Sequence, residues 1–194
     1  MKMEFLKDVA EVKPCIVTPP KNKDNRSELY WLTAANLLND NTISPAEIDT
    51  KYQRDEKLKI NNNDILIKRI NPQYVNLMQN IECEVFASNN LYIVRTIHIK
   101  SSYLAFVLDR CIKQKSKKLS VGAIIPSLSR QDLENIEIPI VPIDQQEKLG
   151  NFWLCSIEKK KLQSKLLELE YLKETQFLNN YIMRGNEENE TYNI

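Results

Sequence analysis

The fold is decided by residues 136–153, IEIPIVPIDQQEKLGNFW, where a short strand pattern gives way to a long helical one. The run from Ile136 to Ile140 alternates apolar and polar residues and is bounded by Asn135 and Pro142, which is typical of a short β-strand. From about residue 144 to residue 184 proline is absent and apolar residues recur at helical spacing. We therefore predict an α+β body over residues 1–143, one long helix over residues 144–184 and a disordered acidic tail over residues 185–194.

The body upstream of this stretch mixes short strands with helices. Strand patterns occur at residues 65–67, 82–86 and 91–99. Ser44, followed by Pro45 and Glu47, has the residue types of a capped helix start, and Ser129 with Asp132 is a weaker version of the same signal. A further helix is predicted to begin near residue 101 and to end in a lysine-rich segment.

The predicted C-terminal helix is longer than the body can cover. About 40 residues at a rise of 1.5 Å each extend about 60 Å. Its distal part carries a leucine seam with 4-and-3 spacing, and the heptad fails at Lys159, Lys173 and Gln176. We therefore predict a short, irregular intermolecular helix pair or coiled coil whose dimerisation residues are Leu162, Leu166 and Leu169.

Composition argues against several classes of protein. The longest apolar run, residues 103–108, is far shorter than the roughly 18 residues of a membrane span, and no secretory signal is recognised, so we expect a cytoplasmic protein without a membrane partner. The formal net charge is +1, with +3 on residues 1–143 and −2 on residues 144–194. Four widely spaced cysteines and one histidine predict no metal site, and we interpret the cysteines as reduced, mostly buried thiols.

The residues needed for cofactor chemistry are also missing. The chain has three glycines, at positions 122, 150 and 185, so it lacks the glycine-rich loops that bind S-adenosylmethionine, nucleoside phosphates or dinucleotides. We expect no cofactor and no catalytic residue. One enzymatic alternative stays open, a small metal-dependent nuclease in which Asp64, Glu82 and Glu84 gather on a hairpin.

Five segments, in this order, resemble the target-recognition half of the specificity subunits of Type I restriction-modification systems, over residues 1 to about 182. They are residues 3–10 (MEFLKDVA), 18–21 (TPPK) followed by 28–33 (ELYWLT), 63–66 (NDIL), 122–133, and 136–146. The chain departs from the family pattern at Val17 and Asn63, where glycines are expected, and at Val141 and Gln145. Asparagine tolerates the left-handed backbone conformation, so we expect the turn at Asn63 to persist.

The resemblance implies a non-catalytic subunit that recognises double-stranded DNA. Family members commonly carry two target domains braced by two helices, and this sequence shows one of each, which implies a half-subunit that forms a homodimer through its helix. A two-fold dimer would direct the complex to a bipartite, palindromic site. The implied partners are the modification (methyltransferase) subunit, which would supply the methyl donor, and the restriction motor-nuclease subunit.

The predicted DNA-binding residues are cations in three groups. They are Lys21, Lys23 and Arg26 in a loop, Lys68 and Arg69 after a strand, and Lys113, Lys115, Lys117 and Lys118 at a helix end. Four polar residues could read bases, but polar residues are equally expected in an exposed loop: Asn22, Asn25, Tyr52 and Gln53. An alternative of another class remains, a helical adaptor for protein assembly that has no DNA specificity.

Overall fold

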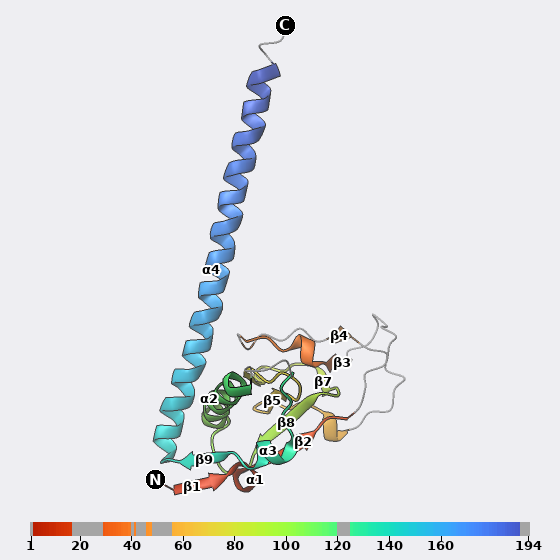
Figure 1. Cartoon of the computed structure of the whole chain (residues 1–194), viewed down its shortest axis with the longest axis vertical. Helices are drawn as coiled ribbons and strands as arrows, with labels where there is room; N and C mark the ends of the chain where they lie inside the picture. Colours follow the sequence, from red (N-terminus) through yellow and green to blue (C-terminus); the bar gives the residue numbers. More distant parts are fainter. Residues whose placement is uncertain are drawn as a thin grey trace. The chain divides into compact units, whose positions relative to one another are not determined.

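The computed structural model describes residues 2–16, 29–39, 41, 46–47, 56–119 and 125–190, with side chains up to residue 181. The chain divides into two compact units, Met1–Leu154 and Cys155–Ile194. The first unit, called the body below, is a mixed α+β domain with short strands, as predicted, and the second is helical (Figure 1).

The central element of the body is a four-stranded antiparallel sheet with the order β2-β8-β5-β6. The strands are β2 (Ala10–Pro14), β8 (Leu91–Thr96), β5 (Ile65–Lys68) and β6 (Val75–Leu77). Ile65, Leu66 and Ile67 are all fully buried, so β5 is covered on both faces, and this explains its unbroken apolar run. Helix α2 (Ser101–Leu119) packs against β6 and β8 and buries Tyr103, Leu104 and Leu108.

A second sheet has the order β4-β3-β7 and corrects one sequence prediction. Strand β3 (Leu29–Leu32) runs parallel to β7 (Glu84–Ala87) and antiparallel to β4 (Ala46–Glu47). The helix start predicted from Ser44, Pro45 and Glu47 is therefore wrong, because Ala46 and Glu47 pair with Trp31 and Tyr30. Pairing with a distant strand overrides a local capping signal.

The N-terminus and the strand before the long helix form a separate two-stranded ribbon. Strand β1 (Lys2–Phe5) pairs antiparallel with β9 (Glu137–Ile140). Between β1 and β2 lies the short helix α1 (Leu6–Val9). Helix α3 (Arg130–Glu134) precedes β9, and Ser129 caps it by accepting a hydrogen bond from the Asp132 amide, so the weaker capping signal is confirmed.

Two short 3₁₀ helices complete the body, η1 (Ala34–Asn36) and η2 (Glu56–Leu58). The described turns use asparagine where many proteins use glycine, with left-handed φ angles at Asn41, Asn63, Asn71, Asn80 and Asn90. The turn predicted at Asn63 is present, with φ of 72°. A chain poor in glycine therefore makes tight turns with the side chain that best tolerates this conformation.

Two smaller predictions are corrected by the structure. Cys15 is buried and Cys111 partly buried, whereas Cys83 and Cys155 are exposed, so the thiols are not mostly buried. Burial raises the pKa of the Cys15 thiol to about 12. The strand expected over residues 91–99 ends at Thr96, which leaves His98 in a bend beyond it.

Helix α4 (Ile143–Glu190) begins one residue before the predicted start and continues past residue 184. Residues 185–190, which were expected to be disordered, are helical, and residues 191–194 lie outside the described part. The body extends to Leu154 rather than ending at residue 143 because the first turns of α4 pack on it. Within the described residues, no helix is long and apolar enough to span a membrane.

Candidate nucleic-acid interface

The body has a hollow of about 320 Å³ between the C-terminal half of α2 and the segment 125–132. The residues that line its apolar part are Pro72, Ile112 and Leu128. The polar lining comes from Lys115, Ser116, Ser127 and Asp132. Below, this feature is called the hollow.

The segment that forms one wall of the hollow is fixed by backbone hydrogen bonds to the chain that follows β5. The amide of Asn71 donates to the carbonyl of Pro126 at 2.8 Å, and the amide of Leu128 donates to the carbonyl of Arg69 at 2.8 Å. The Tyr92 hydroxyl also donates to the Leu128 carbonyl, at 3.0 Å. The left-handed conformation of Asn71, φ 51°, turns the chain between these contacts.

Cations gather beside the hollow from three separate parts of the sequence. Lys115 on α2 donates from Nζ to the Asp132 carbonyl at 3.3 Å. Arg69 and Arg130 are both exposed. The Arg69 carbonyl accepts a hydrogen bond from the Leu128 amide, and Arg130 begins α3 two residues after Leu128, so both residues lie beside the segment that forms this wall of the hollow. Arg130 was missed by the sequence analysis because it stands alone among polar residues.

Acidic side chains also lie at or beside the hollow, so part of its positive charge is neutralised. Arg130 pairs with Glu134 one turn along α3, with 2.7 Å between Nε and Oε1. The Ser129 hydroxyl hydrogen-bonds the Asp132 carboxylate and lowers the pKa of that group. Within the described part of the chain Arg69 forms no ion pair, so it is the cation here that is most available to an anionic ligand such as a phosphate.

Lys68 and Lys113 were predicted to bind DNA, but each makes a contact within the body. Lys68 donates from Nζ to the Tyr74 hydroxyl at 3.0 Å and lies over the Tyr74 ring, 5.0 Å from its centroid. Lys113 pairs with Asp109 at 2.5 Å between Nζ and Oδ2. Because Asp109 is only 6% exposed, Lys113 balances a buried charge, and using it for a DNA contact would leave that charge unpaired.

The side chains of the remaining predicted DNA-binding residues lie outside the described part of the chain. Lys21, Lys23 and Arg26 lie outside the described residues, as do Asn22, Asn25, Tyr52 and Gln53. Lys117 and Lys118 lie on α2, but their side chains are outside the described part. The structure therefore brings together Lys115 and Arg69 from the predicted set, with Arg130 in addition.

Two of the three acids of the nuclease alternative have partners within the body, and the third, Glu82, is exposed. Asp64 is buried and accepts from Nε and Nη2 of Arg95 at 2.7 and 2.6 Å, and from the Asn61 amide at 2.8 Å. Glu84 pairs with Lys59 at 2.8 Å. Among the described residues no group of three acidic, histidine or cysteine side chains is placed to hold a metal ion. This arrangement does not favour a metal-dependent nuclease.

The Gln145-Gln146 pair divides into an exposed residue and a buried one. Gln146 is 4% exposed, and its side chain accepts from the Lys100 amide at 3.0 Å and donates to the Val141 carbonyl at 2.9 Å. It therefore ties the start of α4 to the start of α2. Gln145 is exposed and available to a partner.

Further along α4, Trp153 donates from Nε1 to the buried Asp109 carboxylate at 3.4 Å. Asp109 also accepts from the Val75 amide of β6, at 3.4 Å. This carboxylate thus connects α2, the central sheet and the first turns of α4 within the body.

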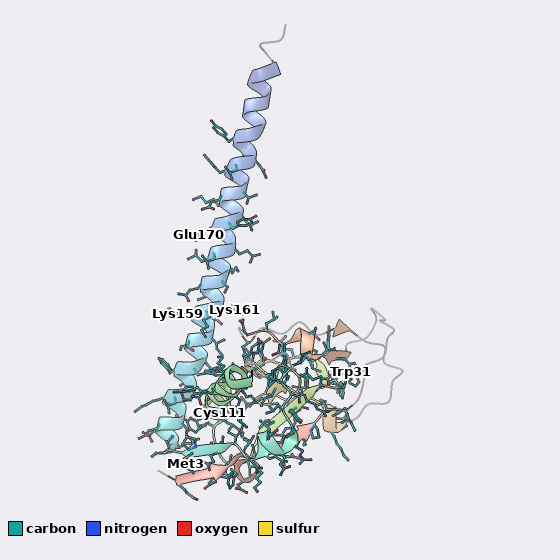
Figure 2. All side chains as sticks on the ribbon, in the orientation of Figure 1. Met3, Trp31, Cys111, Lys159, Lys161 and Glu170 are labelled. Atoms are coloured by element: carbon teal, nitrogen blue, oxygen red, sulfur yellow. The ribbon has the colours of Figure 1, made fainter. Side chains whose placement is uncertain are left out.

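The helical second unit carries the leucine seam. Leu162, Leu166 and Leu169 are 59, 56 and 53% exposed. The first two line a shallow groove together with Cys155 and Lys159. Figure 2 shows the side chains along this part of α4, with Lys159, Lys161 and Glu170 labelled. Further exposed apolar residues on the segment are Leu167, Tyr171, Leu172, Phe177, Leu178 and Tyr181.

Comparisons with known proteins agree with this architecture. The model of a family described as Type I restriction modification DNA specificity domain matches residues 1–171. The chain is similar in fold to the HsdS subunit from Thermoanaerobacter tengcongensis, with 18% identity and a TM-score of 0.60, over 82% of this chain and 37% of that one. It is also similar to the Type I restriction-modification S subunit from M. genitalium, with 12% identity and a TM-score of 0.56, over 87% and 42%.

A third similar structure concerns complex assembly and conformational transition of the type I R-M system, with 18% identity, a TM-score of 0.66, and coverage of 91% and 43%. The chain thus spans less than half the length of these solved chains. The comparison with curated proteins finds no match.

Proposed function

The chain belongs to the Type I restriction modification DNA specificity domain family, and from this we propose that it is a sequence-reading half-subunit that directs a methyltransferase and endonuclease complex to DNA. The observation that carries the proposal is the family match over residues 1–171, which includes the whole body. The described residues of the body add a second support, since Lys115 lines the hollow and Arg69 and Arg130 lie on the segments beside it.

We assign the hollow and its rim to the DNA backbone. Lys115, Arg69 and Arg130 offer donors for phosphate oxygens, and such contacts position a protein on the duplex without reading its sequence. The loop cations Lys21, Lys23 and Arg26 and the helix-end residues Lys117 and Lys118 remain predicted contacts. Base edges would be read by other side chains through directional hydrogen bonds in the major groove.

In this proposal the subunit recognises the DNA sequence and its partner subunits catalyse the reactions. The modification subunit would bind the methyl donor and flip the target adenine out of the duplex, and the motor-nuclease subunit would join for restriction. A subunit that reads DNA in such a complex would act in the cytoplasm. Gln145, which is exposed at the start of α4 beside the buried Gln146, is a candidate contact for the modification subunit.

The second unit would join two copies of the chain into a DNA-reading dimer with two-fold symmetry. Apolar side chains that are more than half exposed are costly in water, and the leucine seam presents three of them on one helical face. Two copies joined along this seam would present two identical bodies to the DNA, so the target is a bipartite palindrome. Leu167, Tyr171 and Leu178 lie on a different side of the helix, and we expect the modification subunit to cover them.

Selection of bound duplexes from a random pool tests this proposal, with the protein co-expressed with its modification subunit. Enrichment of a split palindrome is the expected result, and an asymmetric split site would instead indicate pairing with a different half-subunit. Enrichment of no sequence, with both proteins folded and associated, would contradict DNA reading and favour the helical adaptor.

A further inference from the structure

The connection between β5 and β6 forms a short hairpin tip at the edge of the hollow. The two strands pair antiparallel as far as Ile67 and Val75, and residues 69–73 (RINPQ) make up most of the connection. Below, these five residues are called the tip. Pro72 is buried and lines the hollow. The other four residues of the tip are exposed: Arg69, Ile70, Asn71 and Gln73.

The tip is held in place by the wall of the hollow. Ile70 forms an isolated antiparallel bridge with Ser127. This bridge lies between the two backbone hydrogen bonds that join segment 69–71 to segment 126–128. Pro72 restricts the backbone further, because its ring fixes φ. Side chains on a backbone fixed in this way are suited to contacts that depend on direction.

The two amide side chains of the tip lie next to each other and keep most of their hydrogen-bonding capacity. Gln73 donates from Nε2 to Oδ1 of Asn71 at 3.4 Å, which is longer than the usual range of about 2.7–3.2 Å. Within the described part of the chain, neither side chain makes another hydrogen bond. A glutamine amide can recognise adenine in the major groove by donating to N7 and accepting from the N6 amino group.

The other two exposed residues of the tip have chemistry that suits the rest of an A·T pair. Ile70 is an apolar side chain that is 47% exposed. In the major groove the apolar group that a base pair offers to such a side chain is the C5 methyl of thymine. Arg69 precedes Ile70 in the chain and is one of the cations assigned above to DNA phosphates, so it would hold the tip against the duplex.

We infer that the tip reads one A·T base pair in the major groove, with Gln73 on the adenine and Ile70 on the thymine methyl group. Asn71 acts as a positioning residue, because its Oδ1 accepts one Gln73 proton and orients the amide. Exposed amides and isoleucines are common on protein surfaces, so the argument depends on their combination on one anchored tip beside the cations. The inference rests on the proposed DNA reading and names the residues that read one base pair of the half-site.

Base analogues in the selected duplex test each contact separately, with the protein in complex with its modification subunit. Each adenine of the enriched half-site is replaced in turn by 7-deazaadenine, which lacks the N7 acceptor, and each thymine by uracil, which lacks the methyl group. At one A·T pair, 7-deazaadenine should weaken binding about fivefold, the effect of one lost hydrogen bond. Uracil at the same pair should weaken binding about fourfold, the effect of one methyl group.

Substitutions in the tip then show which residue makes each contact. Gln73→Ala should abolish the response to 7-deazaadenine at that pair, and Ile70→Ala should abolish the response to uracil while retaining the other. Asn71→Gly should reduce the 7-deazaadenine response, and glycine keeps the left-handed turn, φ 51°. Asn80→Gly is the matched control, because Asn80 is also exposed with a left-handed φ, 55°, and lies outside the tip. It should retain both responses.

The outcomes separate this inference from the proposed function. An enriched half-site in which no A·T pair responds to both analogues would overturn the inference and leave DNA reading intact, and this measurement requires no substituted protein. Full responses that persist in Gln73→Ala and Ile70→Ala would overturn it as well, because other residues would then make the contacts. Enrichment of no sequence at all would contradict the proposed function and the inference together.

Discussion

Replacement of Gly150 by alanine tests how α4 crosses α2 in the body. A Cβ at position 150 would lie 2.8 Å from the Cβ of Ser102 and 2.9 Å from the backbone nitrogen of Tyr103, and it would also overlap the Ser102 hydroxyl. Carbon contacts normally lie at about 3.5–4.0 Å, so the helices would have to separate by roughly 0.6 Å or more. The backbone nitrogen cannot move away as a flexible side chain would.

Two opposing effects decide the sign of the change in stability. Alanine in place of glycine inside a helix normally stabilises the fold by about 1 kcal/mol, whereas overpacking a close contact costs about 1–3 kcal/mol. Separation of the helices would also stretch the hydrogen bond from Lys100 to Gln146 and the contact of Trp153 with Asp109. We therefore expect Gly150→Ala to lower the free energy of unfolding by about 1–2 kcal/mol in total.

Urea unfolding followed by circular dichroism measures this change. Asn151→Ala is the matched control, because residue 151 is exposed on the same turn and should gain about 0.5 kcal/mol from helix propensity alone. If Gly150→Ala proved as stable as this control, α4 would not cross α2 at the distance seen here, and the argument for the body extending to Leu154 would fail.

Three further predictions concern the buried ion pair, the hollow and the seam. Asp64→Asn should lower the free energy of unfolding by about 2–3 kcal/mol, because Arg95 loses its carboxylate partner; unchanged stability in urea would contradict a structural role. Arg69→Gln combined with Arg130→Gln should reduce the slope of log affinity for DNA against log salt by about 1.8, since each lost phosphate contact contributes about 0.9. Lys68→Gln should leave that slope unchanged, and an equal loss in this control would refute the assignment of the hollow. Aspartate at all three positions of the leucine seam should give monomers in light scattering, and a persistent dimer would place the interface elsewhere.

The elements that the sequence predicted well depend on local chemistry. The switch from strand to helix between Ile136 and Trp153 is encoded in residue spacing, and Ser129 and Asp132 form a capping box from neighbours in the chain. Likewise the turn at Asn63 follows from the tolerance of one side chain for a left-handed backbone. Each of these signals lies within a few residues of the structure that it specifies.

The candidate site was predicted less completely because it is built from residues far apart in the chain. Arg69, Lys115 and Arg130 meet beside the hollow through hydrogen bonds between segments 69–71 and 126–128. Lys113 was predicted to bind DNA with its neighbours, but Asp109 engages it inside the body. A lysine-rich stretch of sequence shows that positive charge is present. It does not show which of the lysines will pair with a buried carboxylate in the folded protein.

The sequence by itself determined the class of the protein, the α+β body and the long helix, because these follow from periodicity, composition and motif order. Tertiary structure alone decided that Ala46 and Glu47 form a strand, that Asp64 is paired with Arg95, and which cations remain available at the hollow. The physical reason is that strand pairing and ion pairing are settled between residues tens of positions apart, where local propensities of under about 1 kcal/mol per residue are outweighed by burial and long-range hydrogen bonds.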